Sequence, residues 1–479
     1  MKSKVTRRGF MKQMGATTAA FASLNFLSSC SSSEIKEIPL ISDPKGLLDL
    51  PEGFTYKVIS ETGEKMDDGF FVPERPDGMA AFDLPNGDIA LIKNHEIMAE
   101  ITPLSINAEN LKKVPENLSY DGFKGTNLQL GGGTSTLILD GKTKERKKEF
   151  YSLVGTQWNC AGGATPWNTW ISCEETDAKA LQKISLERYV QWGLITEEEA
   201  KAFNYVVKKD HGFAFEVDPL DQELKPAKVL PALGRFKREA VAIDPRTNVI
   251  YQTEDDKKGL FYRFVPTSSR FEGNLQALKI KGRRSYNTRN FGGSLGPGAK
   301  LDVEWVDIAD PEAKGYKLRD YGTQELGATT FSRGEGISVG SDGIYFICTD
   351  GGQKGYGQIW RYIPSYDEGQ KNSNKGGVLE LFYESVNKEE FFMGDNLAVA
   401  PWGDLIVCED NYGMGFTNRL LGMRSNGEVY KIANNVGSSS EFAGACFSSD
   451  KTTMFVNLQE NPGRTIAIQG DWSKLAKIN

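Results

Sequence analysis

Histidine is nearly missing from this sequence, which contains only His95 and His211 among its 479 residues. This scarcity excludes zinc sites built from three histidines and leaves little for nucleophilic catalysis that depends on histidine. A Ser-His-Asp triad would need one of the two, and no Gly-x-Ser-x-Gly motif places a serine on a nucleophile elbow. The chemistry of this chain must therefore come from other side chains.

Long apolar runs, basic clusters and paired cysteines are also lacking. No apolar stretch after residue 30 reaches the ~18 residues of a transmembrane helix. The 57 basic residues are outnumbered by 64 acidic ones and form no polybasic run, which argues against a nucleic-acid partner. The cysteines that follow Cys30 are odd in number, so at least one thiol stays free and the chain is no disulfide scaffold.

The N-terminus carries two adjoining export patterns. Arg7 and Arg8 form a twin-arginine motif, and a mildly apolar run follows at residues 14–27. Residues 27–30, Leu-Ser-Ser-Cys, have the spacing of a lipoprotein cleavage site. We therefore expect residues 1–30 to be a signal peptide, Cys30 to carry lipid, and residues 31–39 to be a polar tether. The mature protein would then be a periplasmic or cell-surface lipoprotein, and an export route for folded proteins hints at a cofactor loaded inside the cell.

A turn, a short apolar strand and then acids recur six times, at residues 83–96, 165–175, 243–256, 340–350, 400–410 and 448–460. A second strand follows each copy, at residues 135–140, 212–219, 259–266, 357–364, 427–432 and 463–468. Strands rich in β-branched and aromatic residues between Gly, Pro and Asp indicate an all-β fold. Two packed sandwiches would also be all-β, but they would not repeat an acid at one place in every unit.

The repeats predict a six-bladed β-propeller that forms a single domain over residues 40–479. Their uneven spacing indicates insertions near residues 101–130, 176–210 and 267–331 that either cap one face of the propeller or only decorate its surface. Residues 185–203 have a helical pattern. The insertions are therefore expected to be partly helical.

We expect the strand that carries the acid to be the innermost strand of each blade, so the acids at its end should all point into one central channel. Carboxylates that converge in this way repel one another unless a cation neutralises them, and Ca²⁺ takes six to eight oxygen ligands. The alternative is that each acid only caps a turn. The acids at strand ends are Glu96, Glu174, Glu254, Glu409 and Asp410, and those in short segments before strands are Glu239, Glu335 and Asp395.

Cys160 differs from the other cysteines because it lies in a loop of small residues, Asn159-Cys-Ala-Gly-Gly163. A thiolate in such a place suits a soft, redox-capable metal such as iron. Cys173, Cys348, Cys408 and Cys446 lie in apolar contexts, where buried packing is the better interpretation.

Several ordered motifs resemble those of the PhoX family of bacterial alkaline phosphatases, over about residues 53–468. They are Pro76-Asp-Gly-Met79, Asn94-His-Glu96, Gly131-Gly-Gly-Thr134, Asn159-Cys-Ala-Gly-Gly163, Thr165-Pro-Trp167, Cys173-Glu-Glu175, Gly234-Arg-Phe236, Arg333-Gly-Glu-Gly336 and Asp395-Asn-Leu397. The resemblance implies twin-arginine export, a six-bladed propeller and a cluster of ferric iron and calcium joined by an oxo group.

The resemblance also implies metal-ligand roles for particular residues. Cys160 and Glu335 would bind iron, with Glu254 or Glu239 beside them. The remaining acids would complete the iron and calcium shells: Glu96, Glu174, Glu175, Asp395, Glu409 and Asp410. The sequence departs from the family in being short and in having Arg238 where a histidine is expected.

The function that the resemblance implies is hydrolysis of small phosphate monoesters by a monomeric enzyme anchored through Cys30. A cluster of metals neutralises the charge of the ester and supplies a metal-bound oxide or hydroxide for attack. Arg333 and Arg238 are the fixed cations expected to stabilise the transferred group. The alternatives are a calcium-dependent propeller lactonase or esterase, and a non-catalytic surface lipoprotein whose metals only stabilise the channel. A lone calcium site has no use for the thiolate of Cys160.

Overall fold

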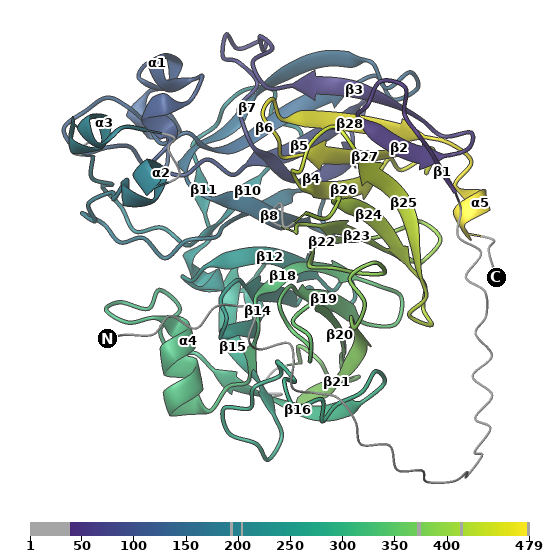
Figure 1. The fold of residues 1–479 in the computed structure, drawn as a ribbon. Coiled ribbons are helices and arrows are strands. Elements are labelled where there is room, and N and C mark those ends of the chain that lie inside the picture. Colours follow the sequence, from purple (N-terminus) through teal and green to yellow (C-terminus); the bar gives the residue numbers. More distant parts are fainter. Residues whose placement is uncertain (1–38, 192–194, 203–204, 371–374, 412–414, 477–479) are drawn as a thin grey trace, which may run out of the picture. The chain divides into compact units, whose positions relative to one another are not determined.

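β-Strands make up most of the described chain, and they form five sheets in a propeller-like arrangement (Figure 1). The computed structural model describes residues 39–191, 195–202, 205–370, 375–411 and 415–476. The predicted signal peptide and nearly all of the predicted tether lie outside these residues. The all-β class predicted from the repeats is confirmed.

Four of the sheets are separate blades. The first joins β4 (Pro76–Asp83), β5 (Ile89–His95), β6 (Gly132–Leu139) and β7 (Arg146–Thr156), and the second joins β8 (Asn159–Ala164), β9 (Trp170–Glu174), β10 (Ala214–Val217) and β11 (Lys228–Val229). The third joins β22 (Gly394–Val399), β23 (Leu405–Glu409), β24 (Arg419–Met423) and β25 (Val429–Asn435), with β2 (Leu48–Pro51) and β1 (Leu40–Ile41) at its edge. The fourth joins β26 (Phe442–Phe447), β27 (Thr453–Leu458), β28 (Arg464–Gln469) and β3 (Thr55–Glu61).

The fifth sheet has ten strands and replaces two of the six separate blades that the repeats predicted. One half contains β12 (Arg238–Ile243), β13 (Ile250–Glu254), β14 (Gly259–Ser269) and β15 (Glu272–Ile280). The other half contains β18 (Gly334–Val339), β19 (Ile344–Cys348), β20 (Gln358–Ile363) and β21 (Lys375–Glu384). The halves are continuous because β16 (Lys300–Asp307) pairs with β15 on one side and β21 on the other, while β17 (Thr330–Phe331) pairs with β14. Part of the predicted insertion at 267–331 is thus sheet, in β15, β16 and β17.

The innermost strands are β4, β8, β12, β18, β22 and β26, and each contacts the next around a closed ring. The acid-tipped strands of the repeats were predicted to be innermost, but they are the second strands: β5, β9, β13, β19, β23 and β27. The inner strands were missed because their sequences are short and rich in small residues, such as NCAGGA in β8 and FAGACF in β26. Only small side chains fit where strands converge, so the usual β-branched signal is weak there.

Strands from the two ends of the described chain close the ring. The N-terminal strand β3 pairs antiparallel with β28, with Val58 opposite Ile466, and the two lie side by side in Figure 1 as purple and yellow arrows. Buried apolar side chains fill the spaces between neighbouring blades. In one of them the rings of Phe261 and Phe346 stack with centroids 4.4 Å apart. Hydrogen bonding between β3 and β28 therefore closes the ring, and apolar packing holds neighbouring units together.

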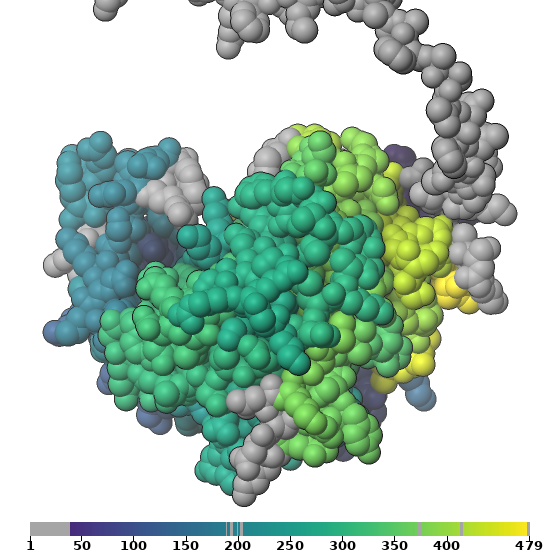
Figure 2. All heavy atoms as spheres, turned by 90° about the horizontal axis from the view of Figure 1, so that it is seen from below, coloured from purple at the N-terminus to yellow at the C-terminus, as the bar shows by residue number. Residues whose placement is uncertain are grey.

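Helices are short and lie mostly in the insertions. Two of them, α2 (Glu187–Gln191) and α3 (Glu197–Ala202), occupy the stretch predicted to be helical, within the blue lobe of Figure 2. None of the helices in the described ranges is both long and apolar enough to span a bilayer. The other helical turns are η1 (Thr102–Leu104), α1 (Ala108–Leu111), η2 (Glu116–Leu118), η3 (Pro231–Leu233), α4 (Leu318–Tyr321), η4 (Gly322–Leu326) and α5 (Ser473–Ala476).

Candidate metal centre

Three positions repeat in every unit at one end of the channel. The rim position directly precedes an inner strand, the inner position is the second residue of that strand, and the exit position directly follows the second strand. In all six units the exit N–H donates to the rim carbonyl, at N···O distances of 2.8 to 3.3 Å. Rim residues are Arg75, Trp158, Lys237, Arg333, Met393 and Glu441; inner residues are Asp77, Cys160, Glu239, Glu335, Asp395 and Ala443; exit residues are Glu96, Glu175, Asp255, Thr349, Asp410 and Gln459.

A break in strand register marks the inner position. In β12, for example, Arg238 pairs with Glu254 and the next paired residue is Val241, so Glu239 lies in a bulge. A bulge leaves a residue out of the ladder and changes the direction of its side chain. The same break occurs in β4, β8, β18 and β22, and one residue later in β26. These bulges carry the candidate ligands.

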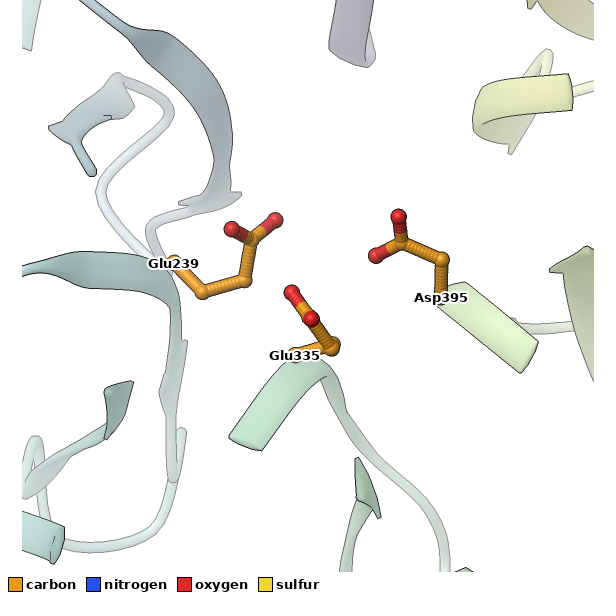
Figure 3. Close-up of side chains that lie close together, drawn as sticks. All are labelled: Glu239, Glu335 and Asp395. Atoms are coloured by element: carbon orange, nitrogen blue, oxygen red, sulfur yellow. The ribbon is translucent and has the colours of Figure 1, made fainter. Parts of the chain in front are cut away.

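Two groups of carboxylates meet at this end of the channel. Oxygens of Glu239, Glu335 and Asp395 lie within 4.8 Å of one another, and Figure 3 shows the three carboxylates turned toward a common space. Asp395 also belongs to a second group with Asp410 and Glu441, again within 4.8 Å. The carboxylates therefore form one connected acidic site.

Burial and mutual repulsion disfavour the charged forms of these acids. Burial raises the pKa of Asp395 to about 7, with the charge of Asp410 as the next cause. Burial also raises the pKa of Glu239, Glu335 and Glu441 well above the usual range, and neighbouring carboxylates add to it. A bound cation would remove this penalty.

The thiol of Cys160 lies next to the first acid group. Its Sγ is 3.4 Å from the backbone oxygen of Glu239, and the side chain is buried. Asn94 holds the bulge by donating from Nδ2 to the carbonyls of Cys160 and Ala161, at 3.1 and 2.7 Å. Burial and the charge of Glu239 raise the pKa of the thiol, so it would ionise only with a compensating cation. The donor set of thiolate and carboxylates fits a metal cluster.

Three cations occupy rim positions. Arg333 adopts a left-handed backbone conformation with φ of 55° and donates from Nε and Nη2 to both oxygens of Asp255, each at 2.9 Å. Its Nη2 also donates to Glu335 at 2.7 Å. Arg75 pairs with Glu96, and Lys237 lies 3.9 Å from Glu175. Carboxylates at the three repeated positions outnumber these cations, so the acids could all be ionised together only with further positive charge in the channel.

Three of the predicted ligands lie outside the acidic site. Glu174, Glu254 and Glu409 are the last residues of second strands, where successive side chains point to opposite faces, so the following exit residue enters the channel instead. Each is buried in its own hydrogen-bonded ion pair. The partners are His211 at 2.6 Å for Glu174, Arg319 at 2.5 Å for Glu254 and Arg419 at 2.6 Å for Glu409.

Arg238 is also turned away from the channel, which corrects its predicted role in holding phosphate. Its guanidinium is fully buried and donates to the carbonyls of Leu233 and Gly234 and to Oε1 of Gln252. The guanidinium lies over the ring of Phe236, with 4.1 Å between its Cζ and the ring centroid. These contacts occupy Arg238 between strands, and no substrate anion can reach it.

The other predicted ligands, Cys160, Glu239, Glu335, Glu96, Glu175, Asp395 and Asp410, occupy inner or exit positions. Sequence reasoning missed three acids of the site. Asp77 lies within the Pro76-Asp-Gly motif, Asp255 follows Glu254, and Glu441 directly precedes β26. Asp255 has a signal in the sequence: it directly follows the acid at the end of its repeat, and the exit position is the residue after the strand. Glu441 has no comparable signal, since the rim position that it occupies carries no acid in the other five units.

The fold and this site together define a propeller-like protein with an acidic channel mouth whose side chains could hold a metal ion. A model of the family described as alkaline phosphatase PhoX matches residues 35–463. The chain therefore belongs to the PhoX alkaline phosphatase family, and its activity is the hydrolysis of phosphate monoesters.

One solved structure of this family has a similar fold, and a second solved structure is a more distant match. PhoX of Pseudomonas fluorescens, in complex with the transition-state analogue vanadate, superposes with a TM-score of 0.64 at 19% identity, covering 91% of this chain and 97% of that one. A gluconolactonase from Xanthomonas campestris gives a TM-score of 0.38 at 9% identity, covering 91% and 95%. No curated protein sequence matches this chain.

Proposed function

We propose that this phosphatase works with a mixed cluster of iron and calcium at the channel mouth. The observation that carries the proposal is the meeting of a buried thiol with two connected groups of carboxylates. Cys160, Glu239 and Glu335 provide the thiolate and carboxylates that suit ferric iron. Asp395, Asp410 and Glu441, with Asp77 and Glu96 nearby in the channel, provide only oxygen donors and suit calcium.

The cluster, when bound, supplies charge neutralisation and Lewis-acid activation for attack on the ester phosphorus. Arg333 is the protein's own contribution to this step. Asp255 fixes its guanidinium through two hydrogen bonds, so its charge is positioned before substrate arrives. A preorganised donor of this kind stabilises the negative charge that develops on the transferred phosphoryl group. No protein nucleophile is needed, which agrees with the burial of both histidines.

Metal analysis and two substitutions test the proposal. The exported protein should contain both iron and calcium and should absorb visible light, because a thiolate bound to ferric iron is coloured. Glu335→Ala should lose metal and activity together. Arg333→Ala should keep the metals and the absorbance, while kcat/KM for p-nitrophenyl phosphate falls by roughly 100-fold, as for loss of a transition-state donor. Zinc as the sole metal, or an Arg333→Ala enzyme with unchanged kinetics, would contradict these assignments.

We further propose twin-arginine export and attachment to a membrane through lipid on Cys30. The support is the sequence pattern of residues 1–30, which lies outside the described structure. Replacing Arg7 and Arg8 by lysine should leave precursor in the cytoplasm, as judged by cell fractionation. Cys30→Ala should release the processed protein from the membrane fraction, and unchanged membrane attachment of this variant would refute the lipid anchor.

A further inference from the structure

Lys237 and Arg333 occupy equivalent places on neighbouring inner strands. Lys237 directly precedes β12, Arg333 directly precedes β18, and these two strands contact each other in the ring. Each side chain pairs with the exit acid of the preceding unit, Lys237 with Glu175 and Arg333 with Asp255. Their backbone carbonyls also accept the same type of hydrogen bond, from the N–H of the exit residue of their own unit. The two cations therefore stand side by side on the channel rim.

The two cations differ in how firmly they are held. Arg333 is fixed by the double hydrogen bond to Asp255 at 2.9 Å. The ammonium of Lys237 is 3.9 Å from Glu175, beyond hydrogen-bonding distance, and its side chain is 36% exposed. A lysine ammonium is a compact charge on a flexible stem, so it can turn from Glu175 to an arriving anion.

Arg75, the third rim cation, is placed differently. It precedes β4, which lies across the ring from β18. It donates to Glu96 twice, to the backbone carbonyl at 3.0 Å and to the carboxylate. Its charge is thus committed to a single acid. Of the rim cations, Lys237 is the one that combines proximity to Arg333 with a loose ion pair.

We propose that Lys237 is a second phosphate-binding side chain, which contacts the phosphoryl oxygens of the substrate beside Arg333. This inference rests on the proposed function, because it assigns Lys237 to the same substrate group. Lys237 would give the site a second charge-assisted hydrogen bond to a dianion. Before substrate binds, the ammonium of Lys237 would lie near Glu175, as it does in this structure.

Binding of inorganic phosphate to the metal-loaded protein, measured by calorimetry, tests this assignment without turnover. Lys237→Gln should weaken phosphate binding about tenfold or more, since a hydrogen bond to a charged group contributes roughly that factor. Its iron and calcium content should not change. Lys237→Arg should restore most of the affinity. Lys147→Gln is the matched control, because Lys147 also pairs with a carboxylate, Asp88 at 2.6 Å, but lies on β7, the outermost strand of its blade.

The outcomes separate this inference from the proposed function. Unchanged phosphate affinity in Lys237→Gln would overturn the role of Lys237, and so would loss of metal, which would show that Lys237 only balances Glu175. Wild-type protein that binds phosphate but holds zinc as its sole metal would refute the proposed iron and calcium cluster and still allow the test of Lys237. Wild-type protein that holds iron and calcium but binds no phosphate would overturn the role of Lys237 alone.

Discussion

The two histidines are buried in opposite electrostatic environments. His211 lies between two carboxylates, with Nδ1 2.6 Å from Glu174 and Nε2 3.2 Å from Asp121. Burial alone would lower its pKa, but the charges and hydrogen bonds of the two acids outweigh burial and raise it to about 9. For His95, burial and the charge of Lys93 lower the pKa to about 3. His211 is therefore charged at neutral pH and His95 is neutral.

The ion pairs of His211 should stabilise the fold in a defined pH range. The folded pKa of about 9 exceeds the ordinary 6.5, so the contribution is complete below pH 6.5 and is lost as the pH rises through 9. The difference between the two pKa values corresponds to about 3 kcal/mol, most of which disappears between pH 7 and pH 10. The protein should thus lose part of its stability under alkaline conditions.

Chemical denaturation of wild type and His211→Gln at pH 7 and pH 10 measures this loss. The advantage of wild type in unfolding free energy should be about 2 to 3 kcal/mol larger at pH 7 than at pH 10. The effect of the metal-centre carboxylates on the unfolding free energy cancels in this comparison, because both proteins carry them. His95→Gln is the control, since a group with a lowered pKa loses its contribution only as the pH falls below 6.5 toward 3. An advantage of wild type over His211→Gln that is equal at both pH values would refute a charged His211.

Two further predictions concern the metal centre. Metal analysis should show that Glu239→Gln loses bound metal and that Glu254→Gln keeps it. Urea unfolding should show that Glu254→Gln only destabilises the fold, because it leaves Arg319 without its buried partner. Equal metal loss in both variants would show that Glu254 also faces the metal centre. Asn94→Ala should remove the two hydrogen bonds from Nδ2 that hold the Cys160 bulge in place. Because the thiol would then be less well positioned to bind metal, the visible absorbance per protein should fall. An unchanged spectrum would show that the bulge is held without Asn94.

Much of the site could be predicted from the sequence because its donor residues recur at fixed places in a repeat. The inner acids Glu239, Glu335 and Asp395 were found by their Gly-flanked or motif contexts, and Cys160 by its loop of small residues. The all-β class followed from strand patterns between turn residues. These properties depend on local composition, which the sequence displays directly.

Tertiary structure decided which of two adjacent residues faces the acidic site. Glu254 and Asp255 differ little in chemistry, but a one-residue step along a strand reverses the side of the sheet, so only Asp255 reaches the channel rim. Arg238 precedes an inner acid, but the bulge after it turns Glu239 to the axis and leaves Arg238 bound to carbonyls between strands. Pairing of β16 with two neighbours likewise joined two halves into one sheet. Register, bulges and strand partners arise from contacts between distant segments, so local sequence does not determine them.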